Sequence, residues 1–305
     1  MFKDFSPVSK LIFSLLVVVF STSLIFILGA LLAIPLFDVN YFTNPEVISP
    51  GGAGNINLAK YFQLINSIGL FVLPSFIISF LFMEGTFSGL KLNKRVDWIG
   101  FALAGLVLVA ALPMVEGFAL FNAKLTLPES LSSIEIWMKD KEELATNITI
   151  EFLKMENWLD LLTNMIMIAF VAAIGEELLF RGVFQRFLSE WFKNVHIAIF
   201  VTAFFFSAFH MQFYGFLPRM FMGVILGYLF VWSNNIWLPI FGHFVNNGMA
   251  IMVYYFMDIN PEDFNGNPEF PFTYTSFFIS MLLVIVICYY FRQRFLKESI
   301  ASTYK

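Results

Sequence analysis

Long apolar runs separated by short polar segments recur along the whole chain. A membrane-spanning helix needs about 20 mostly apolar residues, and about eight runs approach that length. They cover approximately residues 11–37, 60–83, 98–120, 159–181, 195–213, 216–233, 236–257 and 271–291. The pattern predicts an all-α fold: a polytopic membrane helical bundle with about eight transmembrane helices, forming a single transmembrane domain over residues 1–305.

The polar segments between these runs alternate in charge. Lysine and arginine gather before the first run, in segments 84–97 and 182–194, and after residue 291, whereas segments 38–59, 121–158 and 258–270 are acidic. Lysine and arginine stay on the cytoplasmic side of a bilayer. Both termini are therefore predicted to be cytoplasmic, which agrees with an even number of spans.

The acidic segment 121–158 has a pattern of its own. Apolar residues recur at helical spacing through Trp137, Leu144, Ile148 and Phe152, with charged residues between them. This spacing is typical of an amphipathic helix. The helix either lies on the outer membrane face or packs on the bundle as a cap, and the sequence leaves both interpretations open.

Composition and charge exclude several classes of protein. Hydrophobic residues make up 59% of the chain and charged residues 13%, whereas soluble domains carry about 25% charged residues. The chain therefore lacks the polar surface of a soluble enzyme, and its expected surroundings are the lipid bilayer. The net charge of −4 argues against a nucleic-acid partner, because phosphates attract basic surfaces. The single cysteine, Cys288, excludes an intramolecular disulfide and a thiolate metal cluster.

Polar side chains inside the apolar runs are the best indication of function. A charged side chain costs about 2.5–3.5 kcal/mol to insert at the centre of a membrane helix, so it needs a reason to be there. The fourth, fifth and seventh runs contain Glu176, Glu177, Arg181, His210, His243 and Asn247.

Helix geometry separates the roles of these side chains. Glu177 and Arg181 are four residues apart, so they are expected to pair on one helix face. Glu176 points about 100° away and is left without a partner on its own helix. We therefore expect His210 and His243, which lie in other runs, to meet the Glu176 carboxylate.

A carboxylate beside two imidazoles supports more than one interpretation. The carboxylate or a histidine can take a proton from water, while an imidazole or an asparagine amide donates to the resulting oxyanion. Alternatively, Glu176, His210 and His243 can supply the ligands of a catalytic zinc ion. The same polar groups can also serve only to lock helices together, and the residues alone do not separate these interpretations.

Three motifs, each in its own run, resemble the CPBP family, which includes the type II CAAX prenyl proteases and the Abi or bacteriocin-processing proteins. The motifs are Glu176-Glu177-x-x-x-Arg181, Phe206-x-x-x-His210 and His243-x-x-x-Asn247. The resemblance covers residues 158–257, which correspond to the catalytic core of that family. It implies an intramembrane endopeptidase whose partner is a membrane protein or peptide substrate, in some members a prenylated CAAX-type protein.

The resemblance also implies a role for each motif residue. Glu176 would be the general base, and His210 would orient the same water. His243 and Asn247 would stabilise the oxyanion, with Glu177 and Arg181 in support. The family is often labelled a metalloprotease, so zinc is a candidate cofactor. We favour a mechanism without an obligate metal, because no further buried acid is evident to orient a zinc-bound histidine.

Two functions compete with proteolysis. One is a non-catalytic membrane scaffold or bacteriocin-immunity protein of the same fold. The other is a transporter that uses Glu176 as a proton relay, which the absence of duplicated halves in the sequence disfavours. In the protease interpretation we expect an integral protein of the bacterial cytoplasmic membrane, with its catalytic side facing the cytoplasm.

The predicted spans leave a difference in depth between the site residues. Glu176 falls near the cytoplasmic end of its run, whereas His210 lies about 15 residues, or about 22 Å, into its own. The residues can meet if the fourth helix continues beyond Arg181 through Leu188 and the fifth begins above the membrane. The alternative is a site at mid-bilayer with different span edges.

Overall fold

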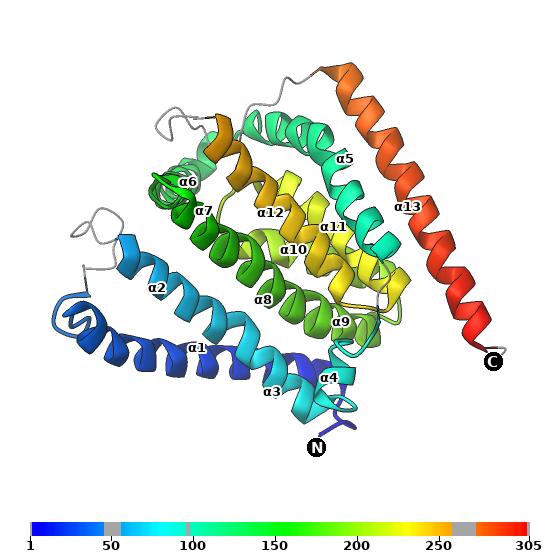
Figure 1. The fold of residues 1–305 in the computed structure, drawn as a ribbon, viewed down its shortest axis with the longest axis horizontal. Helices are drawn as coiled ribbons and strands as arrows, with labels where there is room; N and C mark the ends of the chain where they lie inside the picture. Colours follow the sequence, from blue (N-terminus) through cyan, green and yellow to red (C-terminus); the bar gives the residue numbers. More distant parts are fainter. Residues whose placement is uncertain (1, 46–55, 96–97, 258–272, 304–305) are drawn as a thin grey trace.

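The computed structural model describes residues 2–45, 56–95, 98–257 and 273–303, and every regular element in these ranges is a helix (Figure 1). The all-α prediction is therefore confirmed. The acidic segment predicted at 258–270 lies outside the described residues. The helices are α1 (Pro7–Phe37), α2 (Ile56–Ser67), α3 (Leu73–Phe82), α4 (Thr86–Gly89), α5 (Trp98–Ala123), α6 (Ser132–Leu153), α7 (Trp158–Asn164), α8 (Ala172–Leu179), α9 (Gln185–Phe192), α10 (Val195–Phe209), α11 (Phe216–Ser233), α12 (Trp237–Met257) and α13 (Tyr274–Thr303).

Each of the eight predicted runs coincides with a helix or with helices that continue into one another. Among the described residues, six helical stretches are long and apolar enough to cross a membrane: Pro7–Phe37, Ile56–Phe82, Trp98–Ala123, Trp158–Phe192, Phe216–Ser233 and Tyr274–Leu296. The fifth run forms the shorter apolar helix α10, and the seventh forms α12. The structure is thus a polytopic membrane bundle.

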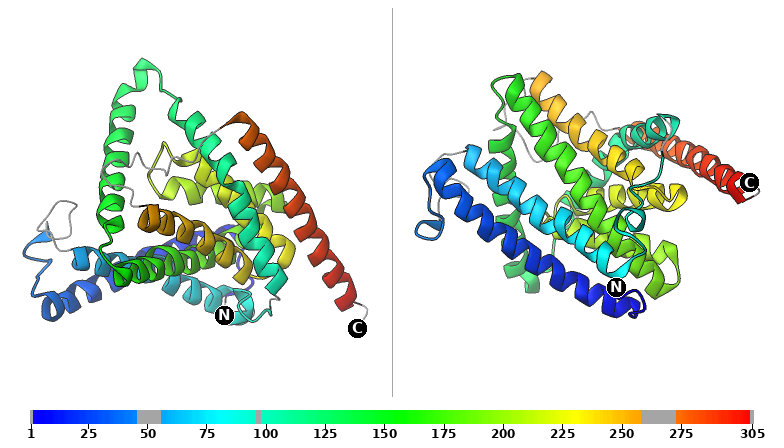
Figure 2. Two further views of the ribbon diagram at one scale, coloured as in Figure 1. Left: turned by 45° about the horizontal axis from the view of Figure 1, so that its top comes forward. Right: turned by 60° about the horizontal axis from the view of Figure 1, so that its bottom comes forward.

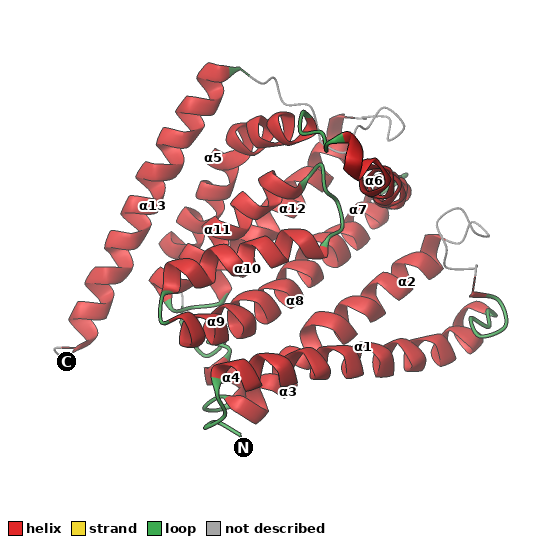
Figure 3. Ribbon diagram, turned by 180° about the vertical axis from the view of Figure 1, so that it is seen from behind, coloured by secondary structure: helices red, strands yellow, loops and turns green. Residues whose placement is uncertain are grey.

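The bundle has a central group of helices flanked by two outer layers (Figure 1). The pair formed by α1 and the α2–α3 stretch lies along one edge, and α13 lies along the opposite edge against α5. Between them, α8 and α9 run beside α10, α11 and α12, as the view from behind also shows (Figure 3). The start of α1 and the end of α13 lie at the same end of the bundle (Figures 1 and 2).

This shared end is held together by polar contacts, and we call it the basic end. Lys10 on α1 pairs with Glu190 on α9 at 3.0 Å. The Arg186 side chain donates to the Gly89 carbonyl, and Trp237 Nε1 donates to the Leu92 carbonyl at 2.9 Å. The turns α4–α5, α9–α10 and α11–α12 therefore meet here. The predicted cytoplasmic side corresponds to this end.

Helix α1 shows how the outer layer is built for lipid. Apart from Val18, its buried residues are small or polar, including Ser14, Ser21 and Ala30, whereas large apolar side chains such as Leu16 and Phe20 are exposed. Ser14 and Ser21 donate to carbonyls of the preceding turn, so no buried hydroxyl lacks an acceptor there. Close packing through small residues is the usual way in which membrane helices associate, because burying apolar surface gains nothing in lipid.

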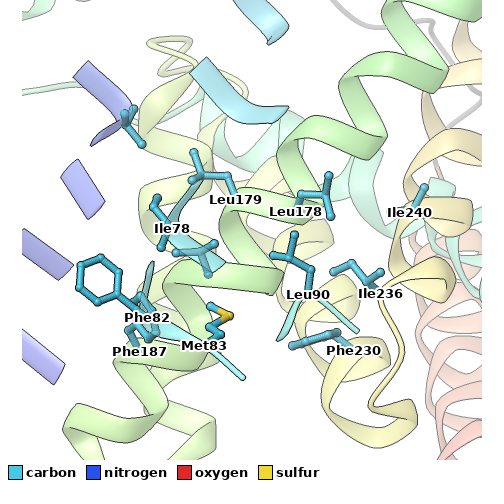
Figure 4. Close-up of a cluster of buried hydrophobic side chains, with 12 residues drawn as sticks. Ile78, Phe82, Met83, Leu90, Leu178, Leu179, Phe187, Phe230, Ile236 and Ile240 are labelled. Carbon is cyan, nitrogen blue, oxygen red and sulfur yellow. The ribbon is translucent and has the colours of Figure 1, made fainter. Parts of the chain in front are cut away.

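A hydrophobic cluster fixes the helix that carries the motif acids (Figure 4). Leu178 and Leu179 on α8 and Phe187 on α9 pack with residues of α3, with Leu90, and with residues at the α11–α12 turn. The remaining members of this cluster include Ile78, Phe82, Met83, Phe230, Ile236 and Ile240. Because such interiors are close-packed, the acids that directly precede these leucines have little freedom to move.

The fourth run is longer than predicted. The run was expected to end at residue 181, but the helical stretch continues from Trp158 to Phe192, with π-helical turns at Met165–Val171 and Phe180–Phe184. Polar residues 181 and 185 interrupt the apolar pattern, yet Arg181 and Gln185 are buried and bonded to helix α11. The helix therefore continues beyond Arg181 and through Leu188, which is the first of the two conditions for the site residues to meet. The depth at which the fifth helix begins stays a prediction.

The amphipathic segment forms α6, which runs from the turn after α5 to the start of α7 (Figure 2, left). Its contacts reach the loop between α10 and α11: the Trp137 and Phe213 rings are 5.2 Å apart, and Glu142 Oε2 accepts from the Tyr214 amide at 3.2 Å. Leu153 packs against the bundle, whereas Leu144 remains exposed. This helix thus packs on the bundle through some residues and leaves other apolar residues exposed. Its position on the outer membrane face stays a prediction.

Gly223 sets the distance between α10 and α11. A Cβ atom at this position would lie 3.0 Å from the Cβ atom of Ala203, closer than side chains pack. We expect Gly223→Leu to lower the free energy of unfolding by about 1–3 kcal/mol, because overpacking forces the helices apart. Thermal unfolding in detergent measures the change. Ala102→Leu, a similar enlargement at an exposed position of α5, should leave the unfolding temperature unaltered; equal behaviour of the two variants would contradict the prediction.

Candidate active site

Glu177 and Arg181 form the ion pair expected from their spacing. Arg181 Nη1 lies 2.8 Å from Glu177 Oε1, and both side chains are fully buried. Arg181 also donates through Nη2 to the Gly223 carbonyl at 3.0 Å. Its guanidinium lies over the Phe206 ring, 4.6 Å from the ring centre. A buried pair is stable only when such additional contacts satisfy the charges, so this pair ties the central helix to α10 and α11.

His243 lies between the two motif glutamates. Its Nδ1 is 2.9 Å from Glu177 Oε1, and its Nε2 is 3.9 Å from Glu176 Oε2. The contact with Glu177 was not predicted, because the sequence assigned His243 to Glu176 alone. Glu177 Oε1 is therefore shared by Arg181 and His243, and the supporting acid orients an imidazole as well as pairing with a cation.

His210 reaches the same carboxylate from another helix. It follows directly after α10, and its Nδ1 is 2.8 Å from the Phe206 carbonyl oxygen. Its Nε2 is 3.9 Å from Glu176 Oε2. The structure thus brings Glu176, His210 and His243 together, as the polar positions in the apolar runs predicted.

The hydrogen-bond partners assign the protons on both imidazoles. A carbonyl oxygen accepts only, so His210 Nδ1 must be the donor. Glu177 is paired with Arg181 and is an acceptor too, so His243 Nδ1 is also the donor. When the two rings are neutral, each Nε2 atom carries a lone pair and lies 3.9 Å from Glu176 Oε2. Three acceptor atoms therefore converge, and Glu176 Oε2 accepts no hydrogen bond from the described residues.

Asn247 lies one turn beyond His243 on α12 but makes other contacts. Its Nδ2 donates to the Ile168 carbonyl at 3.2 Å, and its Oδ1 accepts from Asn246 at 3.2 Å. An amide nitrogen has two hydrogens, so one donor remains after the bond to Ile168. The bond to Ile168 holds Asn247 against the helical stretch Trp158–Phe192. The role of Asn247 in stabilising the oxyanion stays a prediction.

Arg219 is a polar residue that the sequence argument overlooked. It lies on α11, and its Nη2 donates to Gln212 Oε1 at 2.7 Å. Its charge acts on both Glu176 and Glu142. The bond to Gln212 holds the loop that follows His210. The sequence could have indicated Arg219, because an arginine inside an apolar run, here 216–233, is by default a functional candidate.

A cavity of about 160 Å³ lies between α5, α11 and α12. Arg219, Asn246 and Glu116 are among the residues that line it. Asn246 precedes Asn247, and Arg219 is held by the loop after His210. Glu176, His210 and His243 are not in its lining, so the cavity is linked to the convergent acceptors through Arg219 and Asn246.

The site residues do not form a ready metal centre. Among the described residues, no group of three or more His, Cys, Asp and Glu side chains is placed to hold a metal ion. We therefore derive no step through zinc. One argument made from the sequence was nevertheless wrong: a buried acid that orients a site histidine does exist, because Glu177 accepts from His243 Nδ1.

Comparison with known proteins supports the family resemblance that the three motifs indicate. Residues 158–249 match the family model described as type II CAAX prenyl endopeptidase Rce1-like. The match confirms the predicted resemblance over this region, which contains all the motif residues, and it supports a membrane-embedded protease. No curated protein and no solved structure matched the chain. Together with the six described helical stretches that are long and apolar enough to cross a membrane, the match supports an integral membrane protein.

Proposed function

We propose that this chain is an intramembrane endopeptidase that hydrolyses a peptide bond by activating water with Glu176. The single observation that carries the proposal is the convergence of Glu176 Oε2 with the Nε2 atoms of His210 and His243, each 3.9 Å away. These separations are too long for direct hydrogen bonds, but they suit a molecule that donates hydrogen bonds between them. Water is such a molecule, and it is the second substrate of peptide hydrolysis.

The proposed reaction uses the convergent acceptors in sequence. Water donates one hydrogen to Glu176 Oε2 and the other to an imidazole Nε2. Glu176 takes its proton as the water oxygen attacks the scissile carbonyl carbon, which gives a tetrahedral oxyanion. Glu176 then returns the proton to the leaving amine as the carbon–nitrogen bond breaks. General acid–base catalysis of this kind contributes roughly 10²–10⁴-fold in rate.

The assigned protons refine the role of each histidine. His210 and His243 both present an acceptor at Nε2, so in their neutral forms they orient water and do not donate to the oxyanion. The Nε2 atom of His243 becomes a donor only after it takes a proton, and the carboxylate of Glu177 then stabilises the imidazolium. The second amide hydrogen of Asn247 is the remaining candidate for oxyanion stabilisation.

The substrate proposed is a membrane-associated protein or peptide. The reactive group lies among helices that are apolar on their outer faces, so a scissile bond must enter from the bilayer or its surface. Prenylated CAAX-type proteins are one candidate class, suggested by the matched family. The proposed location is the bacterial cytoplasmic membrane, with the basic end in the cytoplasm.

A comparison of membrane peptides tests the proposal. Cells that express the wild-type chain and cells that express Glu176→Ala should be analysed by mass spectrometry of membrane proteins and peptides. We expect cleaved products, and the corresponding loss of precursors, only with the wild type. Identical peptide populations, at equal amounts of folded protein, would favour the scaffold or immunity function instead.

A further inference from the structure

A second, larger pocket lies at the basic end, away from the convergent acceptors. Its volume is about 930 Å³, within the range of ligand-binding sites. It is bounded by the loop before α5, the start of α10, the end of α11 and the last part of α13. Its lining includes Lys94, Arg95 and Arg292, together with His196, and includes no aspartate or glutamate.

The cations of this pocket are not neutralised by neighbouring acids within the described chain. Between described residues, the ion pairs of lysine and arginine involve Lys10, Lys139, Lys154 and Arg181, and none involves a cation of this pocket. Lys10 lies at the same end of the bundle and does have an acid, Glu190. Among the described residues, the pocket therefore concentrates positive charge that no ion pair engages.

Aromatic side chains also line the pocket and form its aromatic wall. Tyr228 and Trp232 stack with ring centres 5.0 Å apart, and the Tyr228 hydroxyl is 2.8 Å from His196 Nδ1. Tryptophan and tyrosine are enriched where membrane meets water, since their rings are apolar and their tips are polar. The wall therefore indicates that the pocket lies at the depth of lipid headgroups.

Helix α13 connects this pocket to the lipid-facing surface. Its exposed apolar residues Phe278, Leu282, Ile285 and Tyr289 follow one another at spacings of three or four, so they share one face. Arg292 and Leu296 continue the same spacing and line the pocket. An apolar stripe suited to acyl chains thus leads directly to a group of cations.

We propose that this pocket binds the phosphate headgroup of an anionic phospholipid, whose acyl chains lie along the exposed face of α13. The phosphate would be held by Lys94 and Arg95, from the loop before α5, and by Arg292 on α13. Basic pockets between membrane helices are known to bind anionic headgroups. A soluble phosphate compound shares the headgroup chemistry but gains nothing from the stripe, so the continuity of stripe and pocket favours the lipid.

Lipid titration of the purified, full-length protein tests the inference. Native mass spectrometry should count phosphatidylglycerol and phosphatidylcholine molecules retained by the wild type, by Lys94→Ala/Arg292→Ala and by the control Lys3→Ala/Lys91→Ala. The control removes the same charge from positions that do not line the pocket. We expect phosphatidylglycerol affinity to fall about 20- to 30-fold in the pocket variant only, because each basic residue near an anionic surface contributes about fivefold.

Three results would overturn the inference. The first is equal binding of phosphatidylcholine and phosphatidylglycerol by the wild type. The second is an equal loss of binding in the pocket variant and the control, which would show a general effect of surface charge. The third is competition by inorganic phosphate at the same concentration as the lipid, which would assign the pocket to a soluble anion. None of these outcomes depends on proteolysis, so the lipid site and the proposed function fail separately.

Discussion

Glu176→Gln should reduce proteolysis by roughly 10²–10⁴-fold while leaving the bundle folded. Glutamine has nearly the shape of glutamate, but its amide cannot take the proton from water. The substituted side chain would fill the same space, 3.9 Å from two imidazoles, so packing and stability should be preserved. Cleavage of an identified substrate by purified protein in lipid measures the rate.

The control for this variant is Glu84→Gln, which makes the same chemical change at an exposed position near the basic end. Its cleavage rate should equal that of the wild type. Size-exclusion profiles and unfolding temperatures should be the same for all three proteins. Cleavage by Glu176→Gln at the wild-type rate would remove Glu176 from the reaction, and the proposed mechanism with it.

Arg181→Ala should cause the largest loss of folded protein. The variant leaves Glu177 buried without its cation, and breaking a buried pair in this way costs about 3–5 kcal/mol. It also removes the bond to the Gly223 carbonyl and the contact with the Phe206 ring. Domains are stable by about 5–15 kcal/mol, so we expect a low yield of monodisperse protein and a lower unfolding temperature in detergent.

A double variant separates stability from chemistry at this pair. Glu177→Leu/Arg181→Leu removes both charges, and replacement of a buried pair by apolar residues is often neutral or stabilising. The double variant should therefore regain much of the folded protein lost in Arg181→Ala, yet it should remain impaired in cleavage because His243 loses its acceptor. Full yield and full activity of Arg181→Ala would show that the pair has no structural role.

The sequence predicted the helices and the meeting of the polar groups for related reasons. Hydrocarbon offers no hydrogen bonds, so apolar runs of sufficient length must become helices, and polar side chains within them must find each other. Glu176 lacked a partner on its own helix, and His210 and His243 were polar motif residues in other runs that could reach it. Their convergence follows from that constraint.

Other features depend on contacts that a single helix does not reveal. The fourth span was predicted to end at Arg181, with Gln185 in the polar segment that follows. Instead, the carbonyls of Gly223 and Gly227 on α11 accept hydrogen bonds from these two side chains. The contact from Glu177 to His243 likewise depends on how two distant helices are placed. Such polar residues look exposed in the sequence because their partners lie about 40 or more positions away.

The shared oxygen of Glu177 bears on how this chain could evolve. One atom accepts from Arg181, which holds the central helices, and from His243, which faces the reactive carboxylate. Glu176 Oε2, by contrast, supports no other described residue. A descendant that abandoned catalysis could lose Glu176 by drift with little effect on folding, whereas Glu177 and Arg181 would remain under selection. Inactive descendants should therefore be recognised by a missing first glutamate in an otherwise intact motif.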